Sequence, residues 1–230
     1  MKKILCILTA LVCAFSIVSC TGNGGGDDNG GNNGGGAKVE IGNPLEEVVA
    51  ASSPTKIVTR VTYIFGDGDA RYGADLNGDY SLEIDGNNAI FTYDFNTFAT
   101  PEEGLEDWIK TVDGKIYFKD GKVSVTEGDE WDTISATTVN RKFELLKNRF
   151  KTYEKSEDEK TLTATITGSN IEGVIGYSIS ALGDISLVLT TDGVYMRGVT
   201  ISYTSIEGAN VTIDTSYSYN DITLDFPTAE

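Results

Sequence analysis

Apolar side chains recur at every second position through most of this chain, and short turns separate the runs. The clearest run covers residues 71–85, where the apolar residues share one parity and the polar residues share the other. The apolar set is Tyr72, Ala74, Leu76, Tyr80, Leu82 and Ile84. A period of two is typical of a β-strand with one buried face. Runs of this kind joined by tight turns predict an antiparallel sheet.

Comparable runs set the rest of the predicted architecture. Strands or hairpins are predicted over 55–65, 89–96, 151–166, 184–190, 194–204, 211–219 and 222–226, with two short strands around a turn at 119–122. An acidic loop is predicted over 97–111, and short helices over 43–52, 139–149 and 169–176. We therefore expect a mainly β chain with about eleven antiparallel strands. These strands would form a curled meander or half-open barrel with two or three short lid helices.

The N-terminus has the anatomy of an export signal. Lys2 and Lys3 precede an uncharged apolar stretch, 4–18, which is too short for an ordinary transmembrane helix. The stretch ends in Ile17-Val18-Ser19-Cys20, which resembles the bacterial lipobox. The resemblance implies that 1–19 is a lipoprotein signal peptide and that Cys20 is lipidated. It also implies a lipid anchor in the outer membrane of a Gram-negative bacterium. The alternative is an ordinary secretory signal cleaved elsewhere.

A linker separates this signal from the rest of the chain. Residues 21–37 contain nine Gly, four Asn and two Asp, so the segment 20–37 is predicted to be a disordered linker behind the anchor. Its expected span is about 20–25 Å. Asp27 and Asp28 resemble the acidic residues that mark surface-displayed lipoproteins but lie later in the chain than such residues usually do, which leaves both the periplasmic face and the cell surface open. A single β-rich domain is expected over 38–230.

Composition excludes several classes of function. Lys and Arg total 18 against 35 Asp and Glu, a net charge of −17, so no nucleic-acid partner is expected. The chain has no His, and its three Cys all lie at or before position 20. A processed chain would therefore lack a His base, a free thiol and His or Cys metal ligands. With no catalytic or dinucleotide-binding motif present, we expect neither an enzyme nor a cofactor.

The candidate ligand-binding residues are the large side chains on the inner parity of the predicted strands. They are Tyr63, Phe65, Tyr80, Leu82, Phe91, Tyr93, Phe95, Tyr203 and Tyr217. Inward aromatic side chains of a curled sheet either pack solid or line a cavity for an apolar or amphipathic ligand.

Two other sites are open alternatives. Trp108 and Trp131 lie in acidic loops and would suit a surface module that binds glycans or proteins. The residues Asp75, Asn77 and Asp79 match the start of a calcium loop. However, Tyr80 replaces the Gly that such a loop requires, so no metal site is assigned.

The order of elements resembles the LolA-like superfamily of lipoprotein-localisation factors and mycobacterial lipid-carrier lipoproteins. The resemblance rests on the helix-forming segment Asn43-Pro44-Leu45-Glu46-Glu47-Val48-Val49 and on the closing strands. Those strands include Leu187-Val188-Leu189-Thr190-Thr191-Asp192-Gly193, Val199-Thr200-Ile201-Ser202-Tyr203-Thr204, Val211-Thr212-Ile213 and Ile222-Thr223-Leu224-Asp225-Phe226-Pro227. The resemblance implies a half-open barrel that carries lipid. The soluble carriers of that family lack an anchor, so Cys20 favours its lipid-anchored members.

Overall fold

The computed structural model describes residues 45–65, 75–98, 109–125, 132–133, 145, 147–175 and 178–227. Its helices are α2 (Leu45–Ala51) and α3 (Glu172–Ile175), with one 3-10 turn, η2 (Lys147–Arg149). Its strands are β1 (Lys56–Ile64), β2 (Leu76–Asp85), β3 (Asn88–Phe98), β4 (Ile109–Lys119), β5 (Lys122–Ser124), β6 (Asp132–Thr133), β7 (Thr152–Lys155), β8 (Thr161–Thr167), β9 (Asp184–Thr191), β10 (Met196–Thr204) and β11 (Asn210–Ser218). None of the helices in these ranges is long and apolar enough to cross a membrane.

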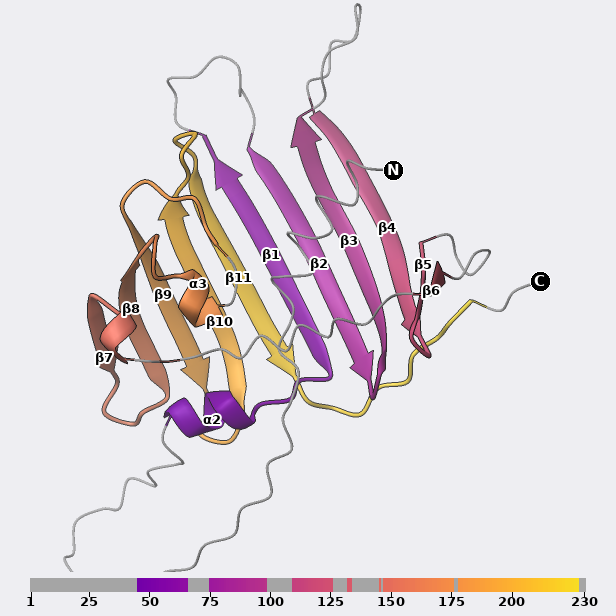
Figure 1. Cartoon of the computed structure of the whole chain (residues 1–230), viewed down its shortest axis with the longest axis horizontal. Helices are drawn as coiled ribbons and strands as arrows, with labels where there is room; N and C mark the ends of the chain where they lie inside the picture. Colours follow the sequence, from indigo (N-terminus) through magenta and orange to yellow (C-terminus); the bar gives the residue numbers. More distant parts are fainter. Residues whose placement is uncertain are drawn as a thin grey trace, which may run out of the picture.

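All eleven strands belong to one antiparallel sheet, shown in Figure 1. The order across the sheet is β6-β5-β4-β3-β2-β1-β11-β10-β9-β8-β7. The chain thus forms two meanders, β1–β6 and β7–β11, and the pairing of β1 with β11 joins them in the middle. Among the described strands no pairing joins β6 to β7, so the sheet is open.

Tight turns account for the hairpins within each meander. At the β4–β5 connection both Asp120 and Gly121 have positive φ, 50° and 74°, the conformation that a two-residue hairpin turn requires. Gly86 turns β2 into β3 with a φ of 58°. The predicted turns at these positions are therefore confirmed.

The strand register separates apolar and charged side chains onto opposite faces. Across the centre of the sheet, Ile57 is paired with Tyr217 on one side and Leu82 on the other. The other face of the same strands carries charged pairs. Lys56 pairs with Glu83 at an N–O distance of 2.6 Å, and Arg60 pairs with Asp79 at 2.7 Å. We call the face of Ile57 the inner face and that of Arg60 the outer face.

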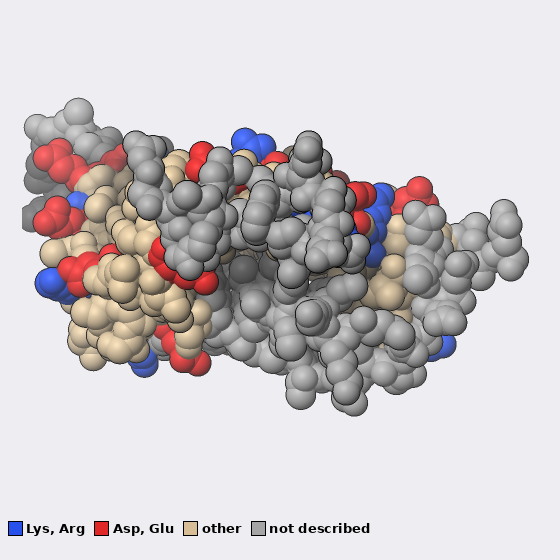
Figure 2. Space-filling model, turned by 90° about the horizontal axis from the view of Figure 1, so that it is seen from above, with Lys and Arg blue, Asp and Glu red and all other residues tan. Residues whose placement is uncertain are grey.

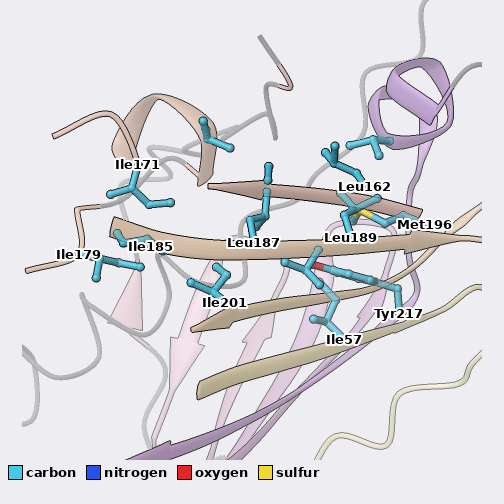
Figure 3. Packing of buried hydrophobic residues seen from close by; sticks show 14 of the residues in the cluster. Ile57, Leu162, Ile171, Ile179, Ile185, Leu187, Leu189, Met196, Ile201 and Tyr217 are labelled. Atoms are coloured by element: carbon cyan, nitrogen blue, oxygen red, sulfur yellow. The ribbon is translucent and has the colours of Figure 1, made fainter. Parts of the chain in front are cut away.

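The short helices cover the inner face at the β8–β11 end of the sheet. Leu45, Val48 and Val49 of α2 are buried, and so are Ile171 and Val174 at α3. They pack with the inner side chains of β8, β9 and β10, as Figure 3 shows for Leu162, Leu187 and Ile201 among others. This half of the sheet therefore has a closed aliphatic core.

Helix α2 lies within the predicted helix 43–52, of which residues 43 and 44 are outside the described ranges. Glu46 and Glu47 lie in its first turn, where the helix dipole favours negative charge. At its C-terminal end the Ser52 hydroxyl donates to the Val48 carbonyl at 2.7 Å and accepts the Met196 N–H at 3.0 Å. The same hydroxyl thus completes the helix end and joins it to β10.

A second contact joins α2 to the edge strand β7. The Tyr153 hydroxyl donates to the Glu46 carboxylate at 2.5 Å, and Lys155 lies 3.3 Å from the same carboxylate. Burial raises the pKa of Glu46, but the hydrogen bonds from Tyr153 and Lys155 outweigh it, so the net pKa lies below 4.5. The ionised form of Glu46 is therefore stabilised by folding.

We expect Tyr153→Phe to lower the free energy of unfolding by about 1 kcal/mol at pH 7. The effect is modest because 38% of the Glu46 side chain is exposed and water screens the interaction. The folded pKa of Glu46 is lowered, so its contribution is present above the unfolded pKa and is lost as the pH falls through the folded value. Urea unfolding from pH 7 to 3 measures this. A difference between variant and wild type that stays constant below pH 4.5 would contradict it.

Several predicted elements differ from the structure. The predicted strand 222–226 is wrong: residues 221–227 have no regular structure. Instead this segment runs past the lower ends of the strands in Figure 1, and the Phe226 ring lies 6.4 Å from that of Tyr117 on the outer face. A side-chain contact thus replaces the expected strand pairing. Lys119 lies over the same Phe226 ring, 5.1 Å from its centroid.

Two other predictions are wrong in part. Of the predicted helix 139–149, the described residues show only the 3-10 turn η2, while 139–144 lie outside the described ranges. The predicted acidic loop 97–111 is wrong at both ends, because β3 extends to Phe98 and β4 begins at Ile109, while 99–108 lie outside the described ranges. The predicted helical turn over 169–176 is confirmed as α3. The fold class is also confirmed: the chain is mainly β and antiparallel, with very little helix.

Candidate functional site

The inner face of β2 and β3 carries a continuous set of aromatic rings. Tyr80 stacks on Phe91 and Phe95, with ring centroids 6.3 and 6.1 Å apart. Tyr93 contacts Phe91 and Phe95 at 5.9 and 6.0 Å. The four rings therefore form one surface. With the neighbouring inner side chains Tyr63 of β1 and Leu82 of β2, we call this surface the aromatic face.

Two glycines let the tyrosine rings lie along the sheet. A Cβ added at Gly78 would meet the Tyr80 hydroxyl at 2.5 Å, and a Cβ at Gly114 would meet the Tyr93 hydroxyl at the same distance. Each ring therefore occupies the space that a side chain at the glycine would fill. Aromatic rings laid over strand glycines in this way shield the backbone and present a flat apolar surface.

No charged side chain belongs to the inner positions of β1, β2 and β3. In register these positions are Ile57, Thr59, Val61 and Tyr63; Leu76, Gly78, Tyr80, Leu82 and Ile84; and Ala89, Phe91, Tyr93, Phe95 and Thr97. Burial raises the pKa of Tyr80 to about 12, so its phenol stays neutral at physiological pH. The aromatic face is therefore chemically suited to the uncharged part of a ligand.

The end of the aromatic face at the C-terminus of β1 carries two further tyrosine hydroxyl groups. Tyr63 and Tyr203 form a side-chain hydrogen bond across β11. Burial, helped by the nearby Glu207 charge, raises the pKa of Tyr63 and keeps that phenol neutral as well. A polar but uncharged ligand group could exchange hydrogen bonds here, while the remaining ligand surface would contact rings.

The two described helices, α2 and α3, lie over the β8–β11 end of the sheet, as Figure 1 shows, whereas the aromatic face lies on β1–β3. Of the nine predicted ligand-binding residues, three are buried in the hydrophobic core: Tyr80, Phe91 and Tyr217, which are 9%, 3% and 6% exposed. Tyr217 lies apart from the other rings, beside Met196, as Figure 3 shows. Phe65 lies just beyond β1, where its N–H donates to Asp75 at 3.3 Å.

The structure brings the remaining predicted residues together on one face. Tyr63, Tyr80, Leu82, Phe91, Tyr93 and Phe95 form the aromatic face, and Tyr203 adjoins it on β10. Sequence reasoning missed Gly78 and Gly114. For Gly78 a signal was present, because position 78 falls on the apolar parity of 71–85. For Gly114 a weaker signal was present, because Val112, Ile116 and Phe118 place position 114 on the apolar parity of its strand.

The calcium alternative does not find support in the geometry of β2. Asp75, Asn77 and Asp79 share one parity, and side chains two residues apart on a strand are separated by about 6.6 Å, too far to converge on one ion. Asp79 is also paired with Arg60 at 2.7 Å. The described residues contain no group of three or more acidic, His or Cys side chains that could hold a metal ion.

Other predicted positions lie outside the described residues. These are the signal peptide 1–19, Cys20 and the linker, together with Trp108 and Trp131. The lipidation of Cys20 and the role of the two tryptophans therefore stay predictions.

The fold defines an open, single-sheet antiparallel β protein with one helix-covered half and one aromatic half. No protein-family model matches the sequence. No curated protein matches it either. A structure described as LolA superfamily protein NE2245 from Nitrosomonas europaea is similar over 78% of this chain and 93% of that one, at 12% identity and a TM-score of 0.32.

A structure described as GphF Dehydratase 1 is similar over 76% of this chain and 80% of that one, at 8% identity and a TM-score of 0.16. At these TM-scores neither likeness carries an argument about this chain. The fold and the site therefore stand on their own geometry.

Proposed function

We propose that this chain is a lipid-anchored outer-membrane protein of a Gram-negative bacterium that binds an apolar or amphipathic ligand without catalysis. The observation that supports this proposal is the aromatic face, a continuous set of uncharged rings on the inner side of β1–β3. Cys20, with the lipobox-like residues before it, supplies the proposed anchor.

The chemistry of the face indicates the class of ligand. Flat rings gain contact area with an acyl chain or another apolar group at a low cost in side-chain entropy. The absence of charge at the described inner positions of β1–β3 disfavours an anionic or cationic group against the rings. The charged part of an amphiphile would therefore lie away from them. The alternative of glycan binding through Trp108 and Trp131 has no observation in its favour among the described residues.

Ligand retention tests the proposal directly. Residues 21–230, expressed through the periplasm and purified without detergent, are expected to carry a discrete added mass in native mass spectrometry. Organic extraction is expected to remove that mass, and a fluorescent fatty acid is expected to bind the extracted protein. A bare mass on a folded protein that also fails to bind the fatty acid would contradict ligand binding.

A matched pair of variants locates the site. Tyr93 on β3 lies on the inner face, while Tyr117 on β4 lies on the outer face against Phe226. We expect Tyr93→Ala to weaken fatty-acid binding by about tenfold, the equivalent of one aromatic contact. Tyr117→Ala is expected to lower stability but leave affinity unchanged. Equal losses of affinity in both variants would mean that folding, not the aromatic face, determines binding.

A further inference from the structure

The turn between β9 and β10 exposes two neighbouring apolar side chains. Val194 is 62% exposed and Tyr195 is 41% exposed. Isolated exposed apolar residues are common on protein surfaces. Here, however, the two residues are adjacent and lie at the tip of a turn.

Hydrogen bonds fix this turn in one conformation. A single oxygen of Asp192 accepts the N–H groups of Val194 and Tyr195, at 2.8 and 2.7 Å. The Tyr195 ring stacks on Tyr219 with centroids 4.3 Å apart, and the Arg197 guanidinium lies 5.5 Å from both rings. A contact made by this turn would therefore lose little conformational entropy.

The charges at the turn compensate each other. The Arg197 guanidinium pairs with Asp192 at 2.5 Å. The backbone N–H groups of Tyr195 and Val194, together with Arg197, lower the pKa of Asp192 to about 2, so the ion pair persists at physiological pH. The tip thus presents apolar surface with no uncompensated charge from its own residues.

The turn lies at the end of the sheet where the chain enters the fold. Ser52, directly after α2, accepts the N–H of Met196 at 3.0 Å. Figure 1 shows the turn directly beside α2 at that end. The chain between Cys20 and Leu45 therefore joins the described structure at α2, about 10 Å along that helix from the Ser52 contact with the turn.

We propose that the β9–β10 turn contacts the bilayer to which Cys20 anchors the chain. The inference rests on the lipid anchor of the proposed function and adds an orientation to it. Val194 would enter the interfacial region of the lipid. Tyr195 and Arg197 have the amphipathic form that suits the boundary between acyl chains and water.

The opposite end of the sheet is the competing surface. It also exposes large apolar side chains, Leu182 and Ile206, and Figure 2 views the molecule from that end, with acidic residues beside an uncharged area. The nine residues of β10 place it about 30 Å further from the entry of the chain. The 24 residues between Cys20 and Leu45 would span about 25–29 Å as a flexible chain. Tether length therefore favours the end that carries Val194.

Because the chain is anchored, even a weak contact between the turn and the bilayer would be populated. Two apolar side chains would bind a bilayer poorly from free solution. An anchored chain holds the turn at an effective concentration of about millimolar or more, so a small intrinsic affinity is enough.

Lipid charge should modulate the contact. The β7–β8 turn lies at the same end of the sheet, because Thr161 pairs with Thr190. It carries an excess of acidic groups, since Glu157 and Asp158 accompany Lys160, while Glu159 pairs with Lys155 at 3.3 Å. These carboxylates would repel anionic lipid over about a Debye length. The contact is therefore expected to be stronger on phosphatidylcholine than on phosphatidylglycerol vesicles at low salt.

The test uses the lipidated chain with one reporter thiol. Val194→Cys is labelled with an environment-sensitive dye, and Ile206→Cys, 64% exposed in the wild type at the opposite end, is the matched control. Both proteins are reconstituted in phosphatidylcholine vesicles that contain a spin-labelled quencher lipid. We expect the label at 194 to be quenched at least about twofold more than the label at 206.

The outcomes separate the orientation from the anchor. Protein that floats with the vesicles but shows no excess quenching at 194, or shows it at 206, overturns the orientation alone. Protein that does not float overturns the anchor and, with it, this inference. Quenching at 194 that weakens on phosphatidylglycerol and recovers in salt supports the contact as proposed.

Discussion

Leu187→Ala is expected to lower the free energy of unfolding by about 3 kcal/mol. Leu187 is fully buried on the inner face of β9, paired with Ala164 on one side and Ile201 on the other. The substitution removes apolar surface from contact and leaves a cavity. Helices α2 and α3 are held over this core by packing and by fixed contacts such as Ser52 with Met196, so the cavity should close only in part. In a chain of this size the melting temperature should fall by about 6–12 °C.

Val188→Ala is the matched control for this prediction. Val188 is the next residue on β9 and lies on the outer face, paired with Thr163 and Thr200. We expect a loss below about 1 kcal/mol, because only strand propensity and partial burial change. Urea unfolding followed by circular dichroism compares the two variants. Similar losses in both would show that the β8–β11 half is not a closed core.

The strands could be predicted because each carries its own evidence in a short stretch of sequence. Alternation placed Tyr80 and Leu82 on one face without any knowledge of the partner strand. Turn residues such as Gly86 and Gly121 identified which neighbours form hairpins. These signals are local, so they could be interpreted residue by residue.

Strand pairing between distant segments could not be predicted in the same way. The joining of β1 to β11 pairs Lys56 with Ser218, and alternation does not specify which strand lies beside which. The contact between Glu46 and Tyr153 is likewise set by tertiary packing over a separation of 107 residues. Residues 222–226 alternate like a strand, yet their Phe226 finds a ring partner in place of a pairing partner. Periodicity indicates that one face of a segment is buried, but it does not indicate which other segment covers that face.

The candidate site, like the fold, could be predicted only in part. The inner parity of Tyr93 and Phe95 could be predicted, and so could the absence of charge beside them. That Tyr217 packs into the aliphatic core while Tyr93 joins the aromatic face depends on where α2 and α3 lie. Helix position follows from the whole chain, so the sequence supplied the candidates, and the structure shows that Tyr80, Phe91 and Tyr217 are buried while Tyr93 and Phe95 are partly buried.

Cys20→Ser is expected to abolish acylation of the chain. The proposed anchor requires a thiolate to form the thioether, and a serine hydroxyl at the same position cannot supply one. The resemblance to a lipobox also makes Cys20 the residue before which the signal is cut, so the variant should keep residues 1–19. Metabolic labelling with a radioactive fatty acid should fall to background, and mass spectrometry should find no peptide that begins at residue 20.

Cys13→Ser is the matched control for this prediction. Cys13 lies in the middle of the apolar stretch 4–18, so its replacement keeps the export signal and the lipobox-like residues. Acylation and the mature N-terminus should both be unchanged. Acylation that persists in Cys20→Ser would place the lipid elsewhere and remove the tether on which the orientation of the β9–β10 turn depends. Ligand binding by the aromatic face would be unaffected, because Tyr80, Phe91 and Tyr93 owe their arrangement to the sheet and not to the anchor.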